Sequence, residues 1–259
     1  MVYKKSKSSN FSKPIKWFWV IFFVGGLSIP AIFLFASFGF MGQMPDHTDL
    51  ENPRTKLATE IISSDGVTIG KFYYRDNRTP VGFDELPNHL VDALIATEDR
   101  RFEDHAGIDF KGTLRAIIKL GKDGGGSTIS QQLAKQLFHG EGSKNKFGRI
   151  IQKIKEWIIA IRLEKQYTKQ EIITQYFNIY DFGNNADGIR SASRIYFGKE
   201  PSSLNISESA MLVGMFKNSS LYNPRPKRNP VGTKNRRDVV LSQMAKYDFI
   251  SEELSLIHI

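Results

Sequence analysis

The chain has 259 residues, with 36 Lys and Arg against 27 Asp and Glu, and a formal net charge of +9 at pH 7. Hydrophobic residues make up 41% of it and charged residues 24%, a globular composition that excludes a wholly disordered or collagen-like chain. The chain has no cysteine, which excludes a disulfide scaffold, a Cys-ligated zinc site and a thiol nucleophile, and no two of its 5 His residues are spaced as a metal-binding pair on one helix.

The N-terminal part of the chain predicts a membrane anchor. Residues 1–16 contain Lys but no acidic residue, and no charged side chain occurs in residues 17–40. At about 1.5 Å per residue, a helix over this apolar stretch exceeds the roughly 30 Å hydrocarbon core of a bilayer. Because lysines before a span keep the N-terminus in the cytoplasm, we predict a cytoplasmic tail over 1–16, a transmembrane helix over 17–41 and an outer location for the rest.

A cleaved signal peptide is the alternative for this segment. The apolar core of such a peptide is usually only about 7–15 residues long, and no small-x-small cleavage site follows Phe40. We therefore favour the anchor. An outer location also argues against nucleic acid as a partner, although the chain is basic.

Residues 42–86 are predicted to form a linker and a β-rich stem. Residues 43–56 are polar and contain two prolines, as linkers do. After them, Ile61-Ile62 and Val67–Ile69 flank Ser64-Asp65-Gly66, a turn sequence typical of β-hairpins.

From Pro87 onward the spacing of apolar residues becomes helical, and we predict one mostly helical domain over 87–245, followed by a tail over 246–259. The first helix leads into Glu98. A later helix begins after Ser127 or Thr128, either of which can cap it.

A long helix is predicted from about Arg149 to Gln166. Its expected buried stripe consists of Ile150, Ile154, Trp157, Ile158 and Ile161. Thr168 and Glu171 are spaced as a capping box that begins the next helix. Two further helices are predicted near 186–197 and 206–217.

The densest group of chemically capable side chains is EDRRFEDHAG, residues 98–107. Two adjacent carboxylates, Glu98 and Asp99, end an apolar helix, and Phe102 and His105 follow them. A carboxylate held against an apolar wall accepts a proton more readily than a solvated one, which suits general-base catalysis. The alternative interpretation is an ordinary solvated helix end.

Two other groups suggest an anion site. Glycines 124–126 precede Ser127 and Thr128, and a helix N-terminus of this kind offers free N–H groups and a positive dipole end. Arg149, Lys153 and Glu156 follow at i, i+4 and i+7 of the long helix. A flexible linker and a plain surface ion pair are the alternatives. Residues 111–165 contain twelve Lys or Arg and four Asp or Glu, which favours an anionic partner at the membrane.

Five blocks of the sequence carry a family resemblance. They are EDRRFEDHAG, GGGSTISQQLAKQ, QKIKEWIIAIRLEKQYTKQEIITQYFN, FGNNADGIRSASRIYFGK and ESAMLVGMFKNSSLYNP. They resemble the motifs of the peptidoglycan glycosyltransferase family, the domain found in class A penicillin-binding proteins and in monofunctional transglycosylases. The match runs over residues 88–240. Three positions depart from the family pattern: Gln152 replaces Arg, Ser130 replaces Thr and Gln136 replaces Asn.

This resemblance implies a mainly α fold: a lysozyme-like helical domain with a lid lobe that dips into the membrane, beside the short β-rich stem and the single N-terminal transmembrane helix. It also implies the reaction, in which lipid II is polymerised into β-1,4-linked glycan strands and undecaprenyl pyrophosphate leaves, with inversion at the sugar carbon. Glu98 would be the catalytic base. Glu156, with Lys153, would act at the leaving group.

The resemblance also implies roles for the neighbouring residues. Asp99, Phe102 and His105 would shape the Glu98 site. The donor's pyrophosphate and sugar would be bound by Ser127, Thr128, Gln132 and Lys135. Arg190 would hold the fourth block against the cleft. A divalent cation, Mg²⁺ or Mn²⁺, would be bound with the substrate pyrophosphate and not by a dedicated metal site. The apolar side chains expected in the lid are Phe110, Leu114, Ile117 and Ile118.

The implied partners are lipid II, the growing lipid-linked chain, the membrane and cell-wall assembly proteins. The implied location is the inner membrane of a bacterium, with the catalytic domain on the periplasmic face. Two alternatives stay open: a lysozyme-like enzyme that cleaves glycan, and a catalytically silent membrane-anchored scaffold. Nothing in the chain resembles a transpeptidase domain, so we expect no β-lactam binding. The stem favours a truncated class A protein over a monofunctional enzyme.

Overall fold

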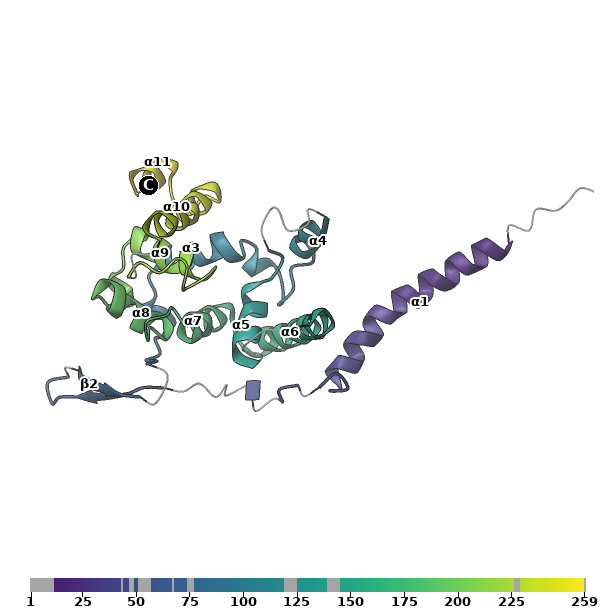
Figure 1. Ribbon diagram of the computed structural model, residues 1–259, viewed down its shortest axis with the longest axis horizontal. Helices are drawn as coiled ribbons and strands as arrows, with labels where there is room; N and C mark the ends of the chain where they lie inside the picture. Colours follow the sequence, from purple (N-terminus) through teal and green to yellow (C-terminus); the bar gives the residue numbers. More distant parts are fainter. Residues whose placement is uncertain are drawn as a thin grey trace, which may run out of the picture. The chain divides into compact units, whose positions relative to one another are not determined.

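The computed structural model describes residues 12–42, 44–46, 49–50, 57–66, 68–73, 77–118, 125–138, 145–225 and 229–258. The chain divides into two compact units, Met1–Met44 and Pro45–Ile259. Figure 1 shows the first unit as one long helix and the second as a helical body with a small hairpin. The predicted loop glycine Gly124 lies outside the described residues.

The first unit consists mainly of helix α1, Ser12–Ser37. An 18-residue window within its segment Pro14–Ser37 has a mean hydropathy of 2.3, and no residue of that window is buried within the protein. By length and composition this helix can cross a membrane, as the sequence predicts. The helix ends a few residues earlier than predicted, because Phe38–Met41 form turns.

The predicted hairpin is confirmed. Strands β1, Thr59–Ile62, and β2, Thr68–Phe72, pair antiparallel, with Glu60 opposite Lys71. The segment that follows is bound to the helical body: Val81 and Asn178 exchange two hydrogen bonds of 2.9 Å each, and the Arg78 guanidinium donates to the Ile179 carbonyl at 3.0 Å. The chain between the stem and the helices is thereby fixed.

The second unit is mainly helical, and the hairpin is the one sheet among its described residues. Three short 3₁₀ helices occur at Phe83–Glu85, Phe102–Asp104 and Pro201–Ser203. The α-helices are α3 Asn88–Glu98, α4 Phe110–Ile118, α5 Ile129–Phe138, α6 Lys146–Gln166, α7 Lys169–Ile179, α8 Gly188–Phe197, α9 Ile206–Met215, α10 Pro230–Lys246 and α11 Glu252–His258. Helix α5 packs against α6 and α7, and α10 packs against α3 and α9 (Figure 1).

The capping box at the start of α7 is confirmed, with the Thr168 side chain accepting from the Glu171 N–H and the Glu171 side chain accepting from the Thr168 N–H. Helix α6 begins three residues earlier than predicted, because the Asn145 side chain caps it at the Gly148 N–H. Helices α8 and α9 lie where the sequence places them.

The predicted buried stripe of α6 is partly wrong. Ile150 is 59% exposed, whereas the buried positions are Glu156, Ile158, Ile159, Ala160 and Leu163. The prediction assumed that neighbouring elements cover α6 along its whole length. Helix α5, which packs against α6, has only 10 residues, whereas α6 has 21. The first turns of α6 are therefore mostly exposed among the described residues, and farther along the helix a carboxylate occupies a buried position.

Candidate active site

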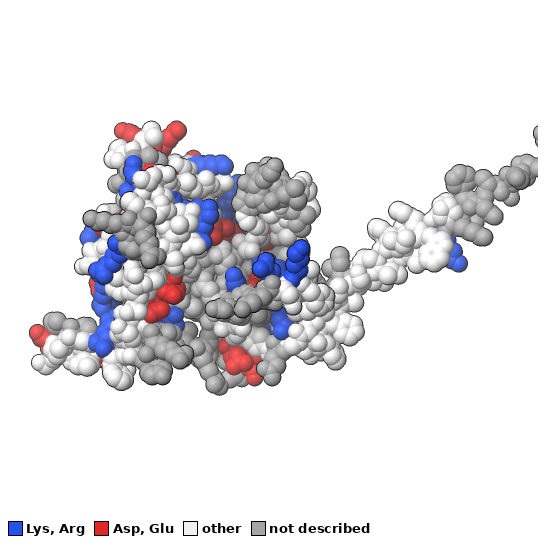
Figure 2. Space-filling model, in the orientation of Figure 1, with Lys and Arg blue, Asp and Glu red and all other residues white. Residues whose placement is uncertain are grey.

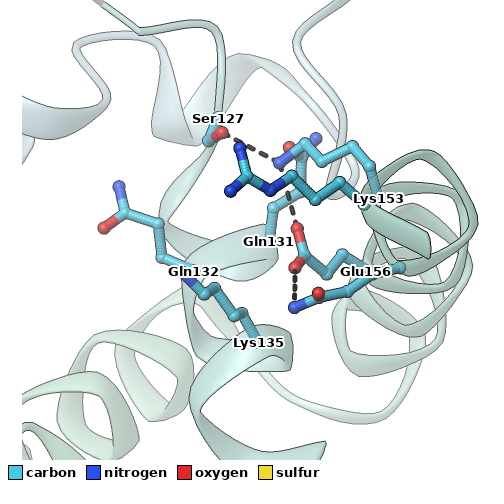
Figure 3. A pocket seen from close by; sticks show the side chains of 8 residues that line it. Ser127, Gln131, Gln132, Lys135, Lys153 and Glu156 are labelled. Carbon is cyan, nitrogen blue, oxygen red and sulfur yellow. Dashed lines mark hydrogen bonds and ion pairs between the residues drawn. The ribbon is translucent and has the colours of Figure 1, made fainter. Parts of the chain in front are cut away.

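Two neighbouring cavities of the helical body share the residues Ser127 and Gln132. The first, which we name the Glu156 cavity, has a volume of about 670 Å³ (Figure 3) and is lined by Ser127, Gln131, Gln132, Lys135, Arg149, Gln152, Lys153 and Glu156. The second, the Glu98 cavity, has a volume of about 680 Å³ and is lined by Ala96, Thr97, Glu98, Arg100, Arg115, Gly125, Ser127, Gln132, Arg236, Val239, Gln243, Lys246 and Tyr247.

The N-terminus of α5 lies beside the residues that the two cavities share. The side chains of Thr128 and Asp99 cap it. Thr128 accepts a hydrogen bond from the Gln131 N–H at 3.2 Å and donates to the Gly107 carbonyl at 2.7 Å. Asp99 accepts from the Ile129 N–H at 3.1 Å and contacts the His105 ring at 3.0 Å. The predicted hydroxyl-capped helix is therefore present. The negative charge of the Asp99 carboxylate also interacts favourably with the positive end of the α5 dipole.

Three of the predicted substrate-contacting residues support the site from beneath. Phe102 has no exposed surface, and Asp99 and Thr128 are buried. None of them lines either of the two cavities. The same holds for His105, whose buried ring contacts Asp99 and lies edge-on to Phe102. Asp99 and Thr128 line a smaller cavity together with Glu98 and Ser127, so the predicted roles of these residues at the site stay predictions.

Glu98 ends α3 and is 18% exposed into its cavity. The Gln132 amide donates to its Oε2 atom at 3.0 Å, and the Tyr176 hydroxyl donates to the Gln132 carbonyl oxygen at 2.8 Å. The Arg236 guanidinium lies 3.7 Å from the other oxygen, Oε1. The carboxylate is thus oriented by α5, α7 and α10 while one side stays open.

A cluster of aromatic rings adjoins Gln132, because the Tyr176 hydroxyl donates to it. The ring of Phe216 lies 4.8 Å from that of Tyr176 and 4.5 Å from that of Tyr180, measured between centroids. Burial raises the pKa of Tyr180 to about 12; a hydrogen bond with Ser219 opposes this, and the negative charges of Glu98 and Asp181 add to it. Tyr180 therefore keeps its hydroxyl proton at neutral pH.

Glu156 is buried, with a side chain that is 7% exposed, so the alternative of a plain surface pair is wrong. The Lys153 ammonium lies 3.2 Å from one carboxylate oxygen, and the Gln152 amide donates to the other at 3.2 Å. Lys153 also donates to the Ser127 hydroxyl at 2.9 Å (Figure 3). This contact connects α6 to one of the two residues that the cavities share.

Cations outnumber carboxylates in both cavities. The Glu156 cavity contains Lys135, Arg149 and Lys153 beside one carboxylate. The Glu98 cavity contains four cations beside one carboxylate: Arg100, Arg115, Arg236 and Lys246. In Figure 2, blue Lys and Arg side chains border a hollow of this face, with red carboxylates between them. Such a surface attracts a ligand with several negative charges.

The side chains of the Glu156 cavity do not form a metal-binding cluster. Among the residues that the structure describes, no three His, Asp or Glu side chains converge. Glu156 already has Lys153 and Gln152 as partners. A resident divalent cation does not fit this set of donors, and a cation bound with the substrate's own phosphate oxygens stays a prediction.

Arg190 lies away from both cavities. It pairs with Glu85 and with Glu200, the latter at 3.3 Å, and donates to the Pro80 carbonyl at 3.1 Å. These contacts join α8 to the segment before α3, and the role of Arg190 in holding the fourth block against the cleft stays a prediction.

The sequence interpretation missed several residues of the cavities. They are Gln131 in the Glu156 cavity, and Arg100, Arg115, Arg236 and Lys246 in the Glu98 cavity, while Gln152 was noted only as a departure from the family pattern. Gln131 and Gln152 stand inside the quoted motifs, so the motif spacing could have found them. Arg236 lies in α10, far from Glu98 in sequence, and no local pattern connects the two.

The transglycosylase family model matches residues 65–245 of the chain, so the match begins within the hairpin, earlier than the sequence motifs indicate. Penicillin-binding protein 1A of Pseudomonas aeruginosa is 36% identical over 214 residues, which cover 81% of this chain and 25% of that protein. Penicillin-binding protein 1F of Bacillus subtilis is 40% identical over 200 residues, which cover 75% of this chain and 27% of that protein.

A third relative, penicillin-binding protein 2a of Streptococcus pneumoniae, is 34% identical over 248 residues, which cover 92% of this chain and 32% of that protein. The crystal structure of penicillin-binding protein 1A from Haemophilus influenzae aligns with 79% of this chain and 20% of that chain, at 25% identity and a TM-score of 0.42. The chain thus spans between 25% and 32% of the length of these three curated relatives.

Proposed function

The chain belongs to the transglycosylase family, and from this premise we propose that it is a peptidoglycan glycosyltransferase that polymerises lipid II into β-1,4-linked glycan strands and releases undecaprenyl pyrophosphate. One observation carries the proposal: two basic cavities, each with a single carboxylate, meet at Ser127 and Gln132. Two lipid-linked sugars carry one pyrophosphate each, so a site that joins them needs two such cavities.

The proposed reaction needs a base for the attacking sugar hydroxyl. Glu98 supports this role because its carboxylate is oriented by Gln132 and Arg236 and is open to its cavity. The hydroxyl proton would move to Glu98 as the oxygen attacks the anomeric carbon of the donor. That attack breaks the bond to pyrophosphate and inverts the configuration at the carbon.

The leaving pyrophosphate needs positive charge that is already in place. Lys153, Lys135 and Arg149 line the Glu156 cavity and supply this charge, and the Ser127 hydroxyl lies beside the Lys153 ammonium. Fixed cations are worth most when charge develops on the leaving group, because they need no reorganisation at that moment. Glu156 holds Lys153 in position in this proposal. A divalent cation, if the substrate brings one, would add charge at the same phosphates.

A membrane location agrees with two features of the chain. Helix α1 is long and apolar enough to cross a bilayer. Helix α4 exposes Phe110, Leu114 and Ile118, which fits the predicted lid that dips into the bilayer interface. The side chain of Ile117 lies outside the described residues. We place the protein in the bacterial inner membrane as a single-pass protein with a periplasmic catalytic domain.

The test is to supply the purified protein with lipid II and to measure glycan polymer and undecaprenyl pyrophosphate together. We expect both products to form in parallel. Cleavage of preformed glycan without polymer would support a lysozyme-like hydrolase instead. Neither reaction would support a silent scaffold.

A further inference from the structure

Arg236 occupies a position that the sequence motifs do not explain. It lies in α10, its side chain is 12% exposed, and its guanidinium is 3.7 Å from Glu98 Oε1. The next residue, Arg237, pairs instead with Asp238 at 2.7 Å. Two adjacent arginines of one helix therefore differ in their partners, and only Arg236 lines the Glu98 cavity.

The stem of Arg236 is fixed by helix α9. Its Nε atom donates to the Gly214 carbonyl at 3.2 Å. A Cβ atom added at Gly214 would lie 3.2 Å from the Arg236 Cγ atom, which is tighter than usual contact. The glycine thus lets the arginine stem cross α9 at close range, and this crossing determines where the guanidinium ends.

The two oxygens of the Glu98 carboxylate have different surroundings. Oε2 accepts a hydrogen bond from Gln132, which Tyr176 holds in place. Oε1 faces Arg236 at 3.7 Å, a distance within ion-pair range but beyond a hydrogen bond. Within the described part of the chain, Oε1 therefore keeps its hydrogen-bonding capacity for a group that enters the cavity.

We propose that Arg236 is a positioning residue for the reaction, which directs Glu98 Oε1 toward the attacking hydroxyl. Gln132 donates to one carboxylate oxygen and Arg236 faces the other, and the two contacts together restrict rotation of the carboxylate plane. The guanidinium also balances the negative charge of a carboxylate that is only 18% exposed. This inference rests on the proposed function, because it assigns Arg236 to the same proton transfer.

The experiment measures kcat and KM for lipid II with Arg236→Gln, Arg236→Lys and Gly214→Ala. We expect Arg236→Gln to lower kcat by about 10- to 100-fold with little change in KM, because a misplaced reacting group costs rate more than binding. Arg236→Lys keeps the charge and should recover part of the rate. Gly214→Ala keeps the arginine but displaces its stem, so its loss in kcat should be smaller.

Arg237→Gln is the matched control, since it removes an adjacent arginine of the same helix that does not face Glu98. It should keep the wild-type kcat. The proposal is overturned if Arg236→Gln keeps kcat within about two-fold of wild type, or if its loss appears only in KM. If Arg236→Gln does not fold, equal kcat for Arg236→Lys, Gly214→Ala and wild type overturns it. A wild-type protein that makes no polymer would instead overturn the proposed function, and this inference with it.

Discussion

The Glu98 side chain combines a fixed orientation with an open side. Changing Glu98 to Gln preserves its volume but removes the proton acceptor. We expect polymerisation of lipid II to fall by about 10²- to 10⁴-fold, the usual cost of losing a general base. Product gels would measure the rate, and circular dichroism should show an unchanged helical signal.

Glu103→Gln is the control for this change, because Glu103 is an exposed glutamate of the same sequence block. It should polymerise at the wild-type rate. Near wild-type activity of Glu98→Gln would remove Glu98 from the proposed mechanism.

Lys153 and Arg149 line the same cavity but differ in their contacts. Lys153 touches both Ser127 and Glu156, whereas Arg149 lies in the exposed first turns of α6. We expect Lys153→Ala to lose about 2–3 kcal/mol of transition-state stabilisation, and Arg149→Ala to lose less. The comparison is kcat/KM on lipid II for both variants. Equal, small losses would mean that Lys153 is an ordinary helix charge.

Among elements, α4 depends on one residue at its start. Asp109 accepts a hydrogen bond from the Gly112 N–H at 2.9 Å and is paired with Arg101 through both carboxylate oxygens. It is therefore both the cap of α4 and its link to the segment after Glu98. Asp109→Ala should destabilise the cap by about 1 kcal/mol. Asp109→Asn keeps a hydrogen-bond acceptor but loses the charge. Thermal unfolding of the two variants therefore distinguishes the contribution of the helix cap to stability from that of the ion pair with Arg101.

The same carboxylate predicts a pH dependence. Burial alone would raise the pKa of Asp109, but hydrogen bonds from Arg101 and Gly112 and the charges of Arg101 and His105 outweigh it, so the pKa lies below its ordinary 3.8. A carboxyl group whose pKa is lower in the folded state than in the unfolded state stabilises the fold fully at pH values above its unfolded-state pKa. This stabilisation is lost as the pH falls through its folded-state pKa. The difference in Tm between wild type and Asp109→Asn should therefore be present at pH 7 and shrink below about pH 4. A constant difference down to pH 2 would contradict this account.

Structural features that depend on residues close together in the sequence could be predicted better than features that depend on packing between distant segments. The capping box of α7 and the hairpin turn involve residues three or four apart, and both are where the sequence places them. The buried stripe of α6 was partly wrong because burial depends on the length of α5, which the sequence of α6 does not contain.

The same limit applies to the site. Glu98 and Glu156 stand in motifs, and the structure brings each to a cavity beside shared residues. Arg236 reaches Glu98 only because α10 packs on α3 and α9. Arg190 stands in a motif too, but its partners Glu85 and Glu200 come from other segments and take it away from the site. The positions of both arginines depend on their packing partners, which the spacing of residues along the sequence does not reveal.

For the whole molecule, the anchor and the helical body are separate units, so the body should fold without the anchor. Deleting residues 1–44 should leave a folded protein that keeps activity on lipid II in detergent. Without the anchor, its local concentration at a bilayer falls, so its rate on lipid II in liposomes should drop. Partial flotation with liposomes is expected, because α4 exposes an apolar face.

A double change in the deletion protein isolates the contribution of α4. Leu114→Ser with Ile118→Ser removes two exposed apolar side chains. This variant should stay folded, because neither side chain is in the core, but it should no longer float with liposomes. Identical flotation of the deletion protein with and without the two changes would exclude α4 as the interfacial element.

The hairpin of the stem has few connections to the rest of the unit. Glu60 pairs with Lys71 at 3.3 Å and with Arg194 of α8 at 3.2 Å, and Lys71 donates to Thr79 at 2.8 Å. Its apolar side chains Ile61, Ile62, Ile69 and Phe72 are exposed. A two-stranded hairpin alone is marginally stable in water.

Local opening of the stem should therefore need less free energy than unfolding of the helices, and its amide hydrogens should exchange with solvent first. In the part of the chain that the structure describes, neither strand pairs with a third, and exposed isoleucines lie beside these edges. Such an edge can pair with a strand of another molecule. Self-association at high concentration would then begin at the hairpin and would leave the two cavities intact. A preparation could thus aggregate while its molecules remain catalytically competent.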